Sequence, residues 1–218
     1  NYTGQNGTYV ITATLNGNAN YNVTTNTNGT LTVGAKDVTI SVDDKVTTYG
    51  DALPQLTVVV SGLVEGDDST AVIAALNVIN YTGDATTYAI EASLTGNANY
   101  NVTANTGGTL TVNAKDVSVA VDDKSISYGD EVPGLTAVVN GLVNGEGNNS
   151  VISSIDVVGY TGNADTYAIE ATLSGNTNYN VTLNTNGTLT VSAKNVTIVV
   201  EDEVITYGDA LPTLTAVV

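Results

Sequence analysis

The chain has 218 residues, with 22 acidic residues against five basic ones, a formal net charge of −17, and neither Cys nor His. Without these two residue types, a Ser-His-Asp triad, cysteine nucleophiles, zinc fingers and haem or iron–sulfur ligation are excluded. The acidic balance disfavours nucleic acid and anionic membrane surfaces, because their phosphates would repel the chain. The longest aliphatic run, residues 71–76, is too short to span a bilayer.

The composition predicts a mostly β fold. Thr contributes 35 residues, Val 32 and Asn 26. Thr and Val are β-branched and favour strands, whereas Asn favours turns. Because Phe and Trp are absent, the 12 Tyr residues are the aromatic residues available to a core.

One unit of 79 residues repeats along the chain. The motif Tyr-Gly-Asp begins at Tyr49, Tyr128 and Tyr207, and residues 98–112 match residues 177–191 at 12 of 15 positions. Repetition of this length without insertions indicates an array of duplicated domains. The chain is expected to be one part of a longer array. The predicted segments are the C-terminal part of a repeat at 1–34, complete repeats at 35–113 and 114–192, and the N-terminal part of a repeat at 193–218.

The first half of a repeat is predicted to contain two strands and a short helix. Apolar and polar residues alternate over 38–42, which predicts a half-buried strand, and a second strand is predicted at 56–60. Gly and Pro mark a turn at 49–54 between them. Residues 67–76 combine N-cap candidates with an Ala-rich stretch, which predicts a short helix.

The second half of a repeat is predicted to contain strands alone. Strands are expected at 78–81 and at 88–94, where Tyr, Ile and Ala alternate with polar residues. Residues 100–103 and 109–112 are predicted to form a hairpin. Its turn, Gly107-Gly108, has residue types that suit a positive φ.

Two architectures fit this order of elements. We favour tandem small β-grasp-like domains, each a mixed sheet with one short helix, and the alternative is a series of Ig-like β-sandwich repeats. The junction at 110–119 has neither Pro nor Gly, so it is expected to be a short, stiff connection. The repeats are therefore expected to form an elongated rod.

Six segments occur in a fixed order in the first complete repeat: Tyr49–Asp51, Leu53–Thr57, Ser61–Asp67, Thr87–Ile90, Asn99–Val102 and Thr109–Val112. In this order they resemble the MBG domains, tandem β-rich repeats of large bacterial surface proteins and adhesins that are related in name and setting to mucin-binding repeat proteins. The second copy departs from the pattern at 131–134 and 145–147, in predicted loops. The resemblance covers the whole chain and implies an extracellular, cell-anchored array.

Recurrent carboxylates are the first candidate site. They occur at Asp43-Asp44, Asp122-Asp123 and Glu201–Glu203. Calcium prefers carboxylate and carbonyl oxygens, so calcium between repeats is one interpretation. We favour the other, a solvated strand end that keeps the sheet soluble and limits edge pairing. The cluster Glu65–Asp68 keeps only Glu146 in the next copy, so no metal or cofactor site is assigned.

Three lysines, Lys36, Lys115 and Lys194, stand at the start of the first strand of successive repeats. A buried Lys beside Asn and a carboxylate can form an intramolecular isopeptide bond, which would suit a rod without disulfides. We favour exposed lysines at the junctions, loosely paired with the neighbouring acidic residue.

The tyrosines at positions 21, 49, 81, 88 and 100 are a candidate platform for sugar rings, because an aromatic face suits the apolar face of a sugar. Tyr88 lies on the apolar side of its predicted strand, and Tyr is the one large side chain available. We therefore favour core tyrosines with hydrogen-bonded hydroxyls.

Ten Asn-X-Ser/Thr triplets occur, among them those that begin at Asn22, Asn101 and Asn180. They are acceptor sites for glycosylation in a suitable host. A chain so rich in Asn and Thr produces such triplets by chance, so they carry little weight.

These observations predict a non-catalytic structural stalk of a large cell-surface adhesin or surface fibre, located outside the cell. One alternative is an adhesive module that binds glycans or mucin, with weak sites multiplied by avidity. Another is a self-assembling filament in which a strand of one chain completes the next. The expected partners are neighbouring repeats, glycans or further copies of the chain, and neither nucleic acid nor membrane insertion is expected.

Overall fold

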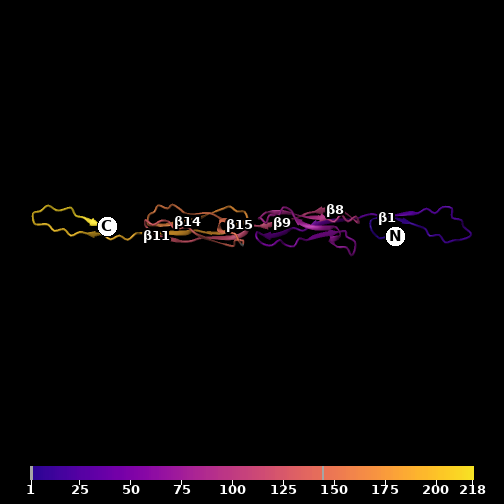
Figure 1. Ribbon diagram of the computed structural model, residues 1–218, viewed down its shortest axis with the longest axis horizontal. Coiled ribbons are helices and arrows are strands. Elements are labelled where there is room, and N and C mark those ends of the chain that lie inside the picture. Colours follow the sequence, from indigo (N-terminus) through magenta and orange to yellow (C-terminus); the bar gives the residue numbers. More distant parts are fainter. Residues whose placement is uncertain (1, 144) are drawn as a thin grey trace. The chain divides into compact units, whose positions relative to one another are not determined.

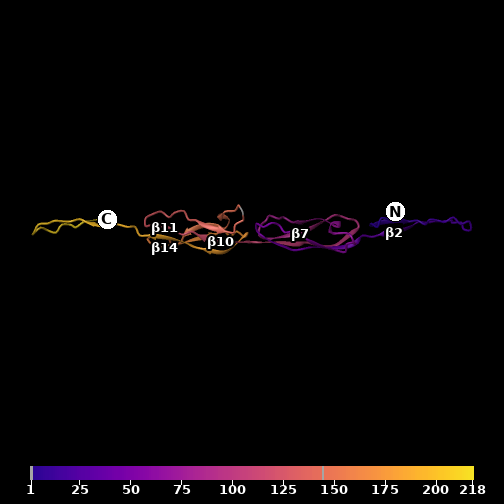
Figure 2. The same ribbon diagram turned by 90° about the horizontal axis from the view of Figure 1, so that it is seen from below.

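The computed structural model describes residues 2–143 and 145–218, and the chain divides into two compact units, Asn1–Ala114 and Lys115–Val218 (Figures 1 and 2). The strands of the first unit are β1 (Gly7–Ile11), β2 (Gly29–Val33), β3 (Lys36–Val42), β4 (Lys45–Thr48), β5 (Val58–Ser61), β6 (Ile73–Val78), β7 (Thr87–Leu94), β8 (Tyr100–Thr106) and β9 (Gly108–Asn113). Those of the second are β10 (Lys115–Val121), β11 (Lys124–Ser127), β12 (Ala137–Asn140), β13 (Ile152–Val157), β14 (Thr166–Leu173), β15 (Tyr179–Thr185), β16 (Gly187–Ser192), β17 (Val199–Val200) and β18 (Ala216–Val217). The prediction of tandem, mostly β domains is confirmed.

Each complete repeat contains two sheets. In the first, one sheet has the strand order β5-β3-β8 and the other has the order β4-β9-β7-β6. The second repeat reproduces them as β12-β10-β15 and β11-β16-β14-β13. Both sheets mix parallel and antiparallel pairs, as the β-grasp-like alternative predicts, but there are two of them, as the sandwich alternative predicts.

Two segments of the chain run parallel and change sheets together. β3 pairs with β8 in one sheet, from Lys36 opposite Tyr100 to Ser41 opposite Thr106. After β3 the chain passes through two residues and enters β4, and after β8 it passes through one residue and enters β9. The strands β4 and β9 then pair with each other in the other sheet. The predicted hairpin of residues 100–103 and 109–112 is therefore wrong, because β8 and β9 lie in different sheets.

The glycines at this change of sheet serve close backbone approach rather than a positive φ. A Cβ on Gly108 would lie 2.6 Å from the carbonyl oxygen of Asp43, and one on Gly107 would lie 2.9 Å from that of Ile90. In the second repeat a Cβ on Gly187 would lie 2.6 Å from the carbonyl oxygen of Asp122. Neither Gly107 nor Gly108 adopts a positive φ.

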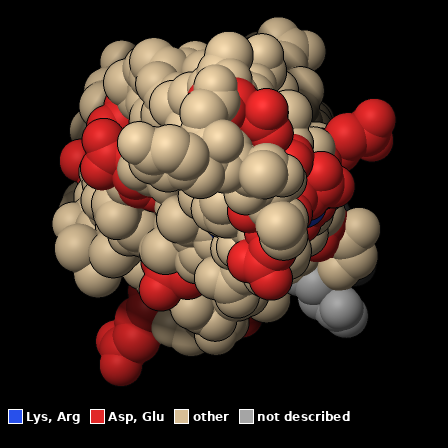
Figure 3. Space-filling view, turned by 90° about the vertical axis from the view of Figure 1, so that its left-hand side faces the viewer, with Lys and Arg blue, Asp and Glu red and all other residues tan. Residues whose placement is uncertain are grey.

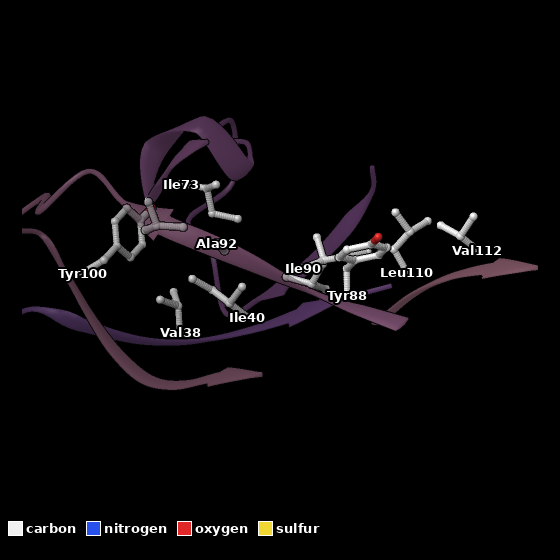
Figure 4. Close-up of a cluster of buried hydrophobic side chains, with 11 residues drawn as sticks. Val38, Ile40, Ile73, Tyr88, Ile90, Ala92, Tyr100, Leu110 and Val112 are labelled. Carbon is white, nitrogen blue, oxygen red and sulfur yellow. The ribbon is translucent and has the colours of Figure 1, made fainter. Parts of the chain in front are cut away.

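The core of the first complete repeat lies between its two sheets (Figure 4). Ile40 of β3, Ile90 of β7 and Leu110 of β9 are at most 1 % exposed. Burial of each of these side chains stabilises the folded state by about 1.5–3 kcal/mol. The alternation predicted over 38–42 and over most of 88–94 is confirmed, since these side chains alternate between buried and exposed positions.

The helix predicted over 67–76 is wrong. That segment holds a single 3₁₀ turn, η1 (Ser69–Ala71), and then enters β6, which pairs antiparallel with β7. The second repeat has the matching turn η2 (Asn148–Ser150). Val72 and Ile73 are buried, so strand pairing and burial outweigh the helix propensity of the alanines. The strand predicted at 78–81 lies earlier in the chain, as β6 (Ile73–Val78).

Outside the complete repeats, β1 pairs with β2 and β17 pairs with β18, both antiparallel. The positions equivalent to the buried Ile90 and Ile40 are Ile11 and Ile198, which are 55 % and 62 % exposed. The two complete repeats therefore provide the packed environments in which candidate sites can be compared.

Candidate functional site

The recurrent carboxylates lie where β3 passes into β4. The Asp43 carboxylate accepts a hydrogen bond from the hydroxyl of Thr57, and the ammonium group of Lys45 donates to that same hydroxyl oxygen at 2.6 Å. Asp44 accepts the backbone N–H of Thr109 at 2.7 Å. The two neighbouring acids thus bind different partners, one directly before β5 and one on β9.

The second repeat reproduces this arrangement. The Asp122 carboxylate accepts from the Thr136 hydroxyl at 2.5 Å, and the ammonium group of Lys124 donates to that hydroxyl at 2.8 Å. Asp123 accepts the backbone N–H of Thr188 at 2.8 Å. Within 2–143 and 145–218, no cluster of three or more Asp, Glu, His or Cys side chains is placed to hold a metal ion.

Tyr88 is a core residue with a bonded hydroxyl, as favoured from the sequence. It is 8 % exposed, and its hydroxyl donates to the carbonyl oxygen of Asp84 at 3.0 Å and lies 2.8 Å from the hydroxyl of Thr82. The ring of Tyr81 meets that of Tyr88 edge to face, with centroids 5.0 Å apart. Tyr81 itself is 36 % exposed, so of these two rings of the candidate sugar platform Tyr88 is buried and Tyr81 covers it.

Tyr100 anchors the loop between β5 and η1. Its hydroxyl donates to the Asp67 carboxylate and accepts the backbone N–H of Val64 at 3.1 Å. The bond to Asp67 raises the pKa of Tyr100, because losing the phenolic proton would set two anions face to face. The other tyrosines named from the sequence are not core residues to the same degree, since Tyr49 is half-buried and Tyr21 is 78 % exposed.

The Asn-X-Thr triplet at Asn101 is used by the fold. The Asn101 side-chain amide donates to the Asp37 carboxylate at 2.7 Å, and the Thr103 hydroxyl donates to the carbonyl oxygen of Val38 at 3.1 Å. The register of β3 and β8 shifts between Val38 and Thr39, and Thr103 supplies a donor at that irregularity. Asn180 and Thr182 make the same two bonds in the second repeat, at 2.7 Å and 3.1 Å.

The lysines at the repeat starts are not deeply buried. Lys36 and Lys194 are exposed, and Lys115 is half-buried. A lysine becomes a nucleophile when burial holds it neutral, so exposed lysines do not meet the requirement of isopeptide chemistry. The placement of Lys36 and Lys194 agrees with the interpretation favoured from the sequence, whereas Lys115 is more buried than that interpretation predicts.

The Tyr-Gly-Asp motif forms a β-turn in every copy. The N–H of Asp51 donates to the carbonyl oxygen of Thr48 at 3.0 Å, and Gly50 sits in the third turn position with a φ of 84°. A residue in that position of a type II turn needs a positive φ, which glycine adopts without strain. In the second copy the Asp130 carboxylate also accepts the N–H of Ser127 at 3.1 Å, so the aspartate closes the turn from both sides.

The comparison with protein families identifies this pattern. The profile of the MBG domain (YGX type) matches residues 38–111 and 117–190. The chain belongs to the MBG domain family. Comparison with the curated proteins gives no match. The Tyr-Gly-Asp turn is therefore a family feature with a structural cause, and MBG domains are typical of surface-associated proteins.

One shallow hollow recurs in both MBG repeats. In the first it has a volume of about 320 Å³ and lies beside Val72, Leu94, Asn97 and Tyr100. In the second it has about 210 Å³ and lies beside the equivalent residues Val151, Leu173, Asn176 and Tyr179. The Asn97 side chain is committed to the fold, because its amide donates to the carbonyl oxygen of Ala71 at 3.1 Å and its oxygen accepts the N–H of Asn99 at 3.0 Å.

The chain is strongly acidic, with a formal net charge of −17. On the face shown in Figure 3, acidic side chains are scattered among uncharged ones rather than gathered into one patch. In the part of the chain that the structure describes, no helix has the length and apolar character that crossing a membrane requires.

The sequence reading missed the partners of the acidic residues. Thr57 was assigned only to a strand, yet it joins Asp43 to Lys45. A usable signal existed, since an acidic residue is followed by Thr at an interval of 14 residues in all three copies, and the hydroxyl of Thr215 donates to Glu201 at 3.2 Å.

Proposed function

We propose that this array of MBG domains is a non-catalytic stalk segment of a cell-surface adhesin, located outside the cell. One observation carries the proposal: recurrent polar side chains on β3, β8 and the residues between β3 and β4 are hydrogen-bonded within their own repeat. Asp43 binds Thr57, Asp44 binds Thr109, and Asn101 binds Asp37. Such residues serve the fold.

The connection between repeats supports a spacer role. β9 ends at Asn113 and β10 begins at Lys115, so a single residue separates the last strand of one repeat from the first strand of the next. A connection this short limits the relative freedom of successive domains far more than a flexible linker does. The charge of −17 adds mutual repulsion and solubility.

Small-angle scattering of the purified chain tests the stalk. A compact globule of 218 residues would have a radius of gyration of about 17 Å. We expect a value well above this, together with a β-type circular dichroism spectrum that excludes an unfolded chain. A folded protein with a radius of gyration near that of the compact globule would contradict the proposal. Assays on glycans and peptides are expected to show no turnover.

The recurrent hollow favours glycan binding as a second candidate function. It combines apolar side chains with a Tyr and lies at the same place in both repeats, which suits weak sites multiplied along an array. Leu94 and Leu173 line it and are 45 % and 39 % exposed. If a glycan array yields a ligand, the double variant Leu94→Glu and Leu173→Glu should abolish its binding. Binding that survives this change would place the ligand elsewhere.

A further inference from the structure

The first and last segments of a complete repeat are paired with each other, in parallel, over most of their length. Residues 36–48 comprise β3 and β4, and residues 100–113 comprise β8 and β9. β3 pairs with β8 and β4 pairs with β9, both parallel. Tension along the polypeptide enters the repeat at the start of β3 and leaves it at the end of β9.

Parallel pairing determines how that tension acts. Since both segments run in the same direction, pulling the start of one and the end of the other drags them past each other along their length. The interstrand hydrogen bonds then resist together, in shear. If the two segments were pulled apart at one end, these bonds would instead break one after another.

Side-chain bonds join the two segments at three levels. At the start, the Asn101 amide donates to Asp37 at 2.7 Å, and at the irregularity in the middle, the Thr103 hydroxyl donates to the carbonyl oxygen of Val38 at 3.1 Å. At the change of sheet, Asp44 accepts the N–H of Thr109 at 2.7 Å. There the backbones are so close that a side chain at Gly108 would overlap the carbonyl oxygen of Asp43.

We propose that each complete MBG repeat is a mechanical clamp, in which the parallel segments resist tension along the chain and keep the domain folded under load. The inference rests on the proposed stalk function, to which it adds load bearing. The second repeat carries the same device: β10 pairs with β15 and β11 pairs with β16, both parallel. Its side-chain bonds recur as well, from Asn180 to Asp116, Thr182 to Val117, and Thr188 to Asp123.

Single-molecule force measurements on the full chain can separate shear from peeling without altering the clamp. The chain contains no cysteine, so two introduced cysteines define the points of attachment. Lys36→Cys with Asn113→Cys loads the segments in shear. Lys36→Cys with Ala98→Cys loads the same repeat at one end, because the N–H of Lys36 bonds to the carbonyl oxygen of Asn99 at 2.8 Å. All three positions are exposed.

The clamp predicts a rupture force several-fold higher in shear than in peeling, at equal pulling speed. Forced unfolding is governed by the unfolding rate. Both variants start from the same fold, so a difference in rupture force reports the direction in which the segments are loaded. Unfolding from residue 36 to residue 113 releases at most about 250–280 Å of extended chain, which identifies the event. Equal forces in the two geometries, or a lower force in shear, would overturn the proposal.

A matched pair of substitutions locates the resistance. Thr103→Val removes a hydroxyl bond between the two segments, whereas Ser93→Ala removes a hydroxyl bond of 3.2 Å to the carbonyl oxygen of Ala75, between β7 and β6. In the shear geometry, Thr103→Val should lower the rupture force and Ser93→Ala should leave it unchanged. Equal losses would show that the parallel pair is not the clamp. Scattering reports the stalk and force reports the clamp, so the two proposals fail separately.

Discussion

The hydroxyl of Tyr100 bonds to the carboxylate of Asp67, 33 residues earlier in the chain, and ties the loop after β5 to the start of β8. In the second repeat Tyr179 makes the corresponding bond to Glu146. The acidic cluster of the first copy is lost there except at this position, since Gly147 replaces Asp68. The acid that the second repeat retains, Glu146, is therefore the one that is hydrogen-bonded to a tyrosine.

This bond gives the fold a specific response to alkaline pH. The pKa of Tyr100 is raised above its ordinary value of 10.0 by the Asp67 bond, and that of Tyr179 is raised chiefly by burial. A raised folded-state pKa gives stability that is complete below the unfolded-state value of about 10 and is lost as the pH rises through the folded-state value. In a spectrophotometric titration, Tyr100→Phe should remove a phenol that ionises above pH 10.

The matched control for this titration is Asp67→Asn, which removes the carboxylate that accepts the Tyr100 hydroxyl. It should lower the pKa of Tyr100 toward its ordinary value, because the hydrogen bond to Asp67 is the main cause of the raised pKa. If Asp67→Asn leaves the ionisation of Tyr100 unchanged, the Tyr100–Asp67 bond does not hold the proton.

Glycine at the change of sheet is expected to be irreplaceable. Gly187→Ala would place a Cβ 2.6 Å from the carbonyl oxygen of Asp122, and such overpacking costs about 1–3 kcal/mol in the free energy of unfolding. Gly134→Ala in the same repeat meets open space and should change that free energy by less than about 0.5 kcal/mol. Urea unfolding of both variants checks the difference, and equal midpoints would contradict the crowding.

Thr57 is expected to stabilise its repeat through its hydroxyl. Thr57→Val keeps the shape but removes the donor to Asp43 and the acceptor of Lys45, so we expect a loss of about 1–3 kcal/mol in the free energy of unfolding. The control is Thr39→Val on β3, which is exposed and should be close to neutral. Chemical denaturation of the two variants measures the difference. A Thr57→Val protein as stable as the control would show that the hydroxyl is dispensable.

Calcium is expected to leave the thermal stability of the repeats unchanged. The carboxylates of Asp43 and Asp44 already bind Thr57 and Thr109. A thermal melt in calcium should therefore match one in a chelator. A rise in melting temperature with calcium that Asp44→Asn abolishes would instead restore the metal interpretation of these acids.

Much of the fold follows from alternation in the sequence. The strands at Val38 and at Tyr88 were predicted because apolar side chains at every second position need one buried face, and the structure buries Val38, Ile40 and Ile90. The short strand β4 was missed, since three of its four residues are polar, none is buried, and its partner strand lies 65 residues later. Non-local parallel pairing leaves no local pattern to detect.

The change of sheet was also beyond a local reading. A Gly pair between two strands usually marks a hairpin, but here Gly108 permits two backbones to touch. Likewise, calcium was one interpretation of Asp43-Asp44 because the sequence shows the acids and not their partners. Only the structure shows that the Thr57 hydroxyl and the Thr109 N–H use them.

The most direct test of the stalk is the growth of the radius of gyration with the number of complete repeats. Proteins with two and four copies of residues 35–113 would be compared by small-angle scattering. An extended array should nearly double its radius of gyration when the number of repeats doubles. An increase of only about 1.3-fold, as expected for a compact protein, would contradict the account.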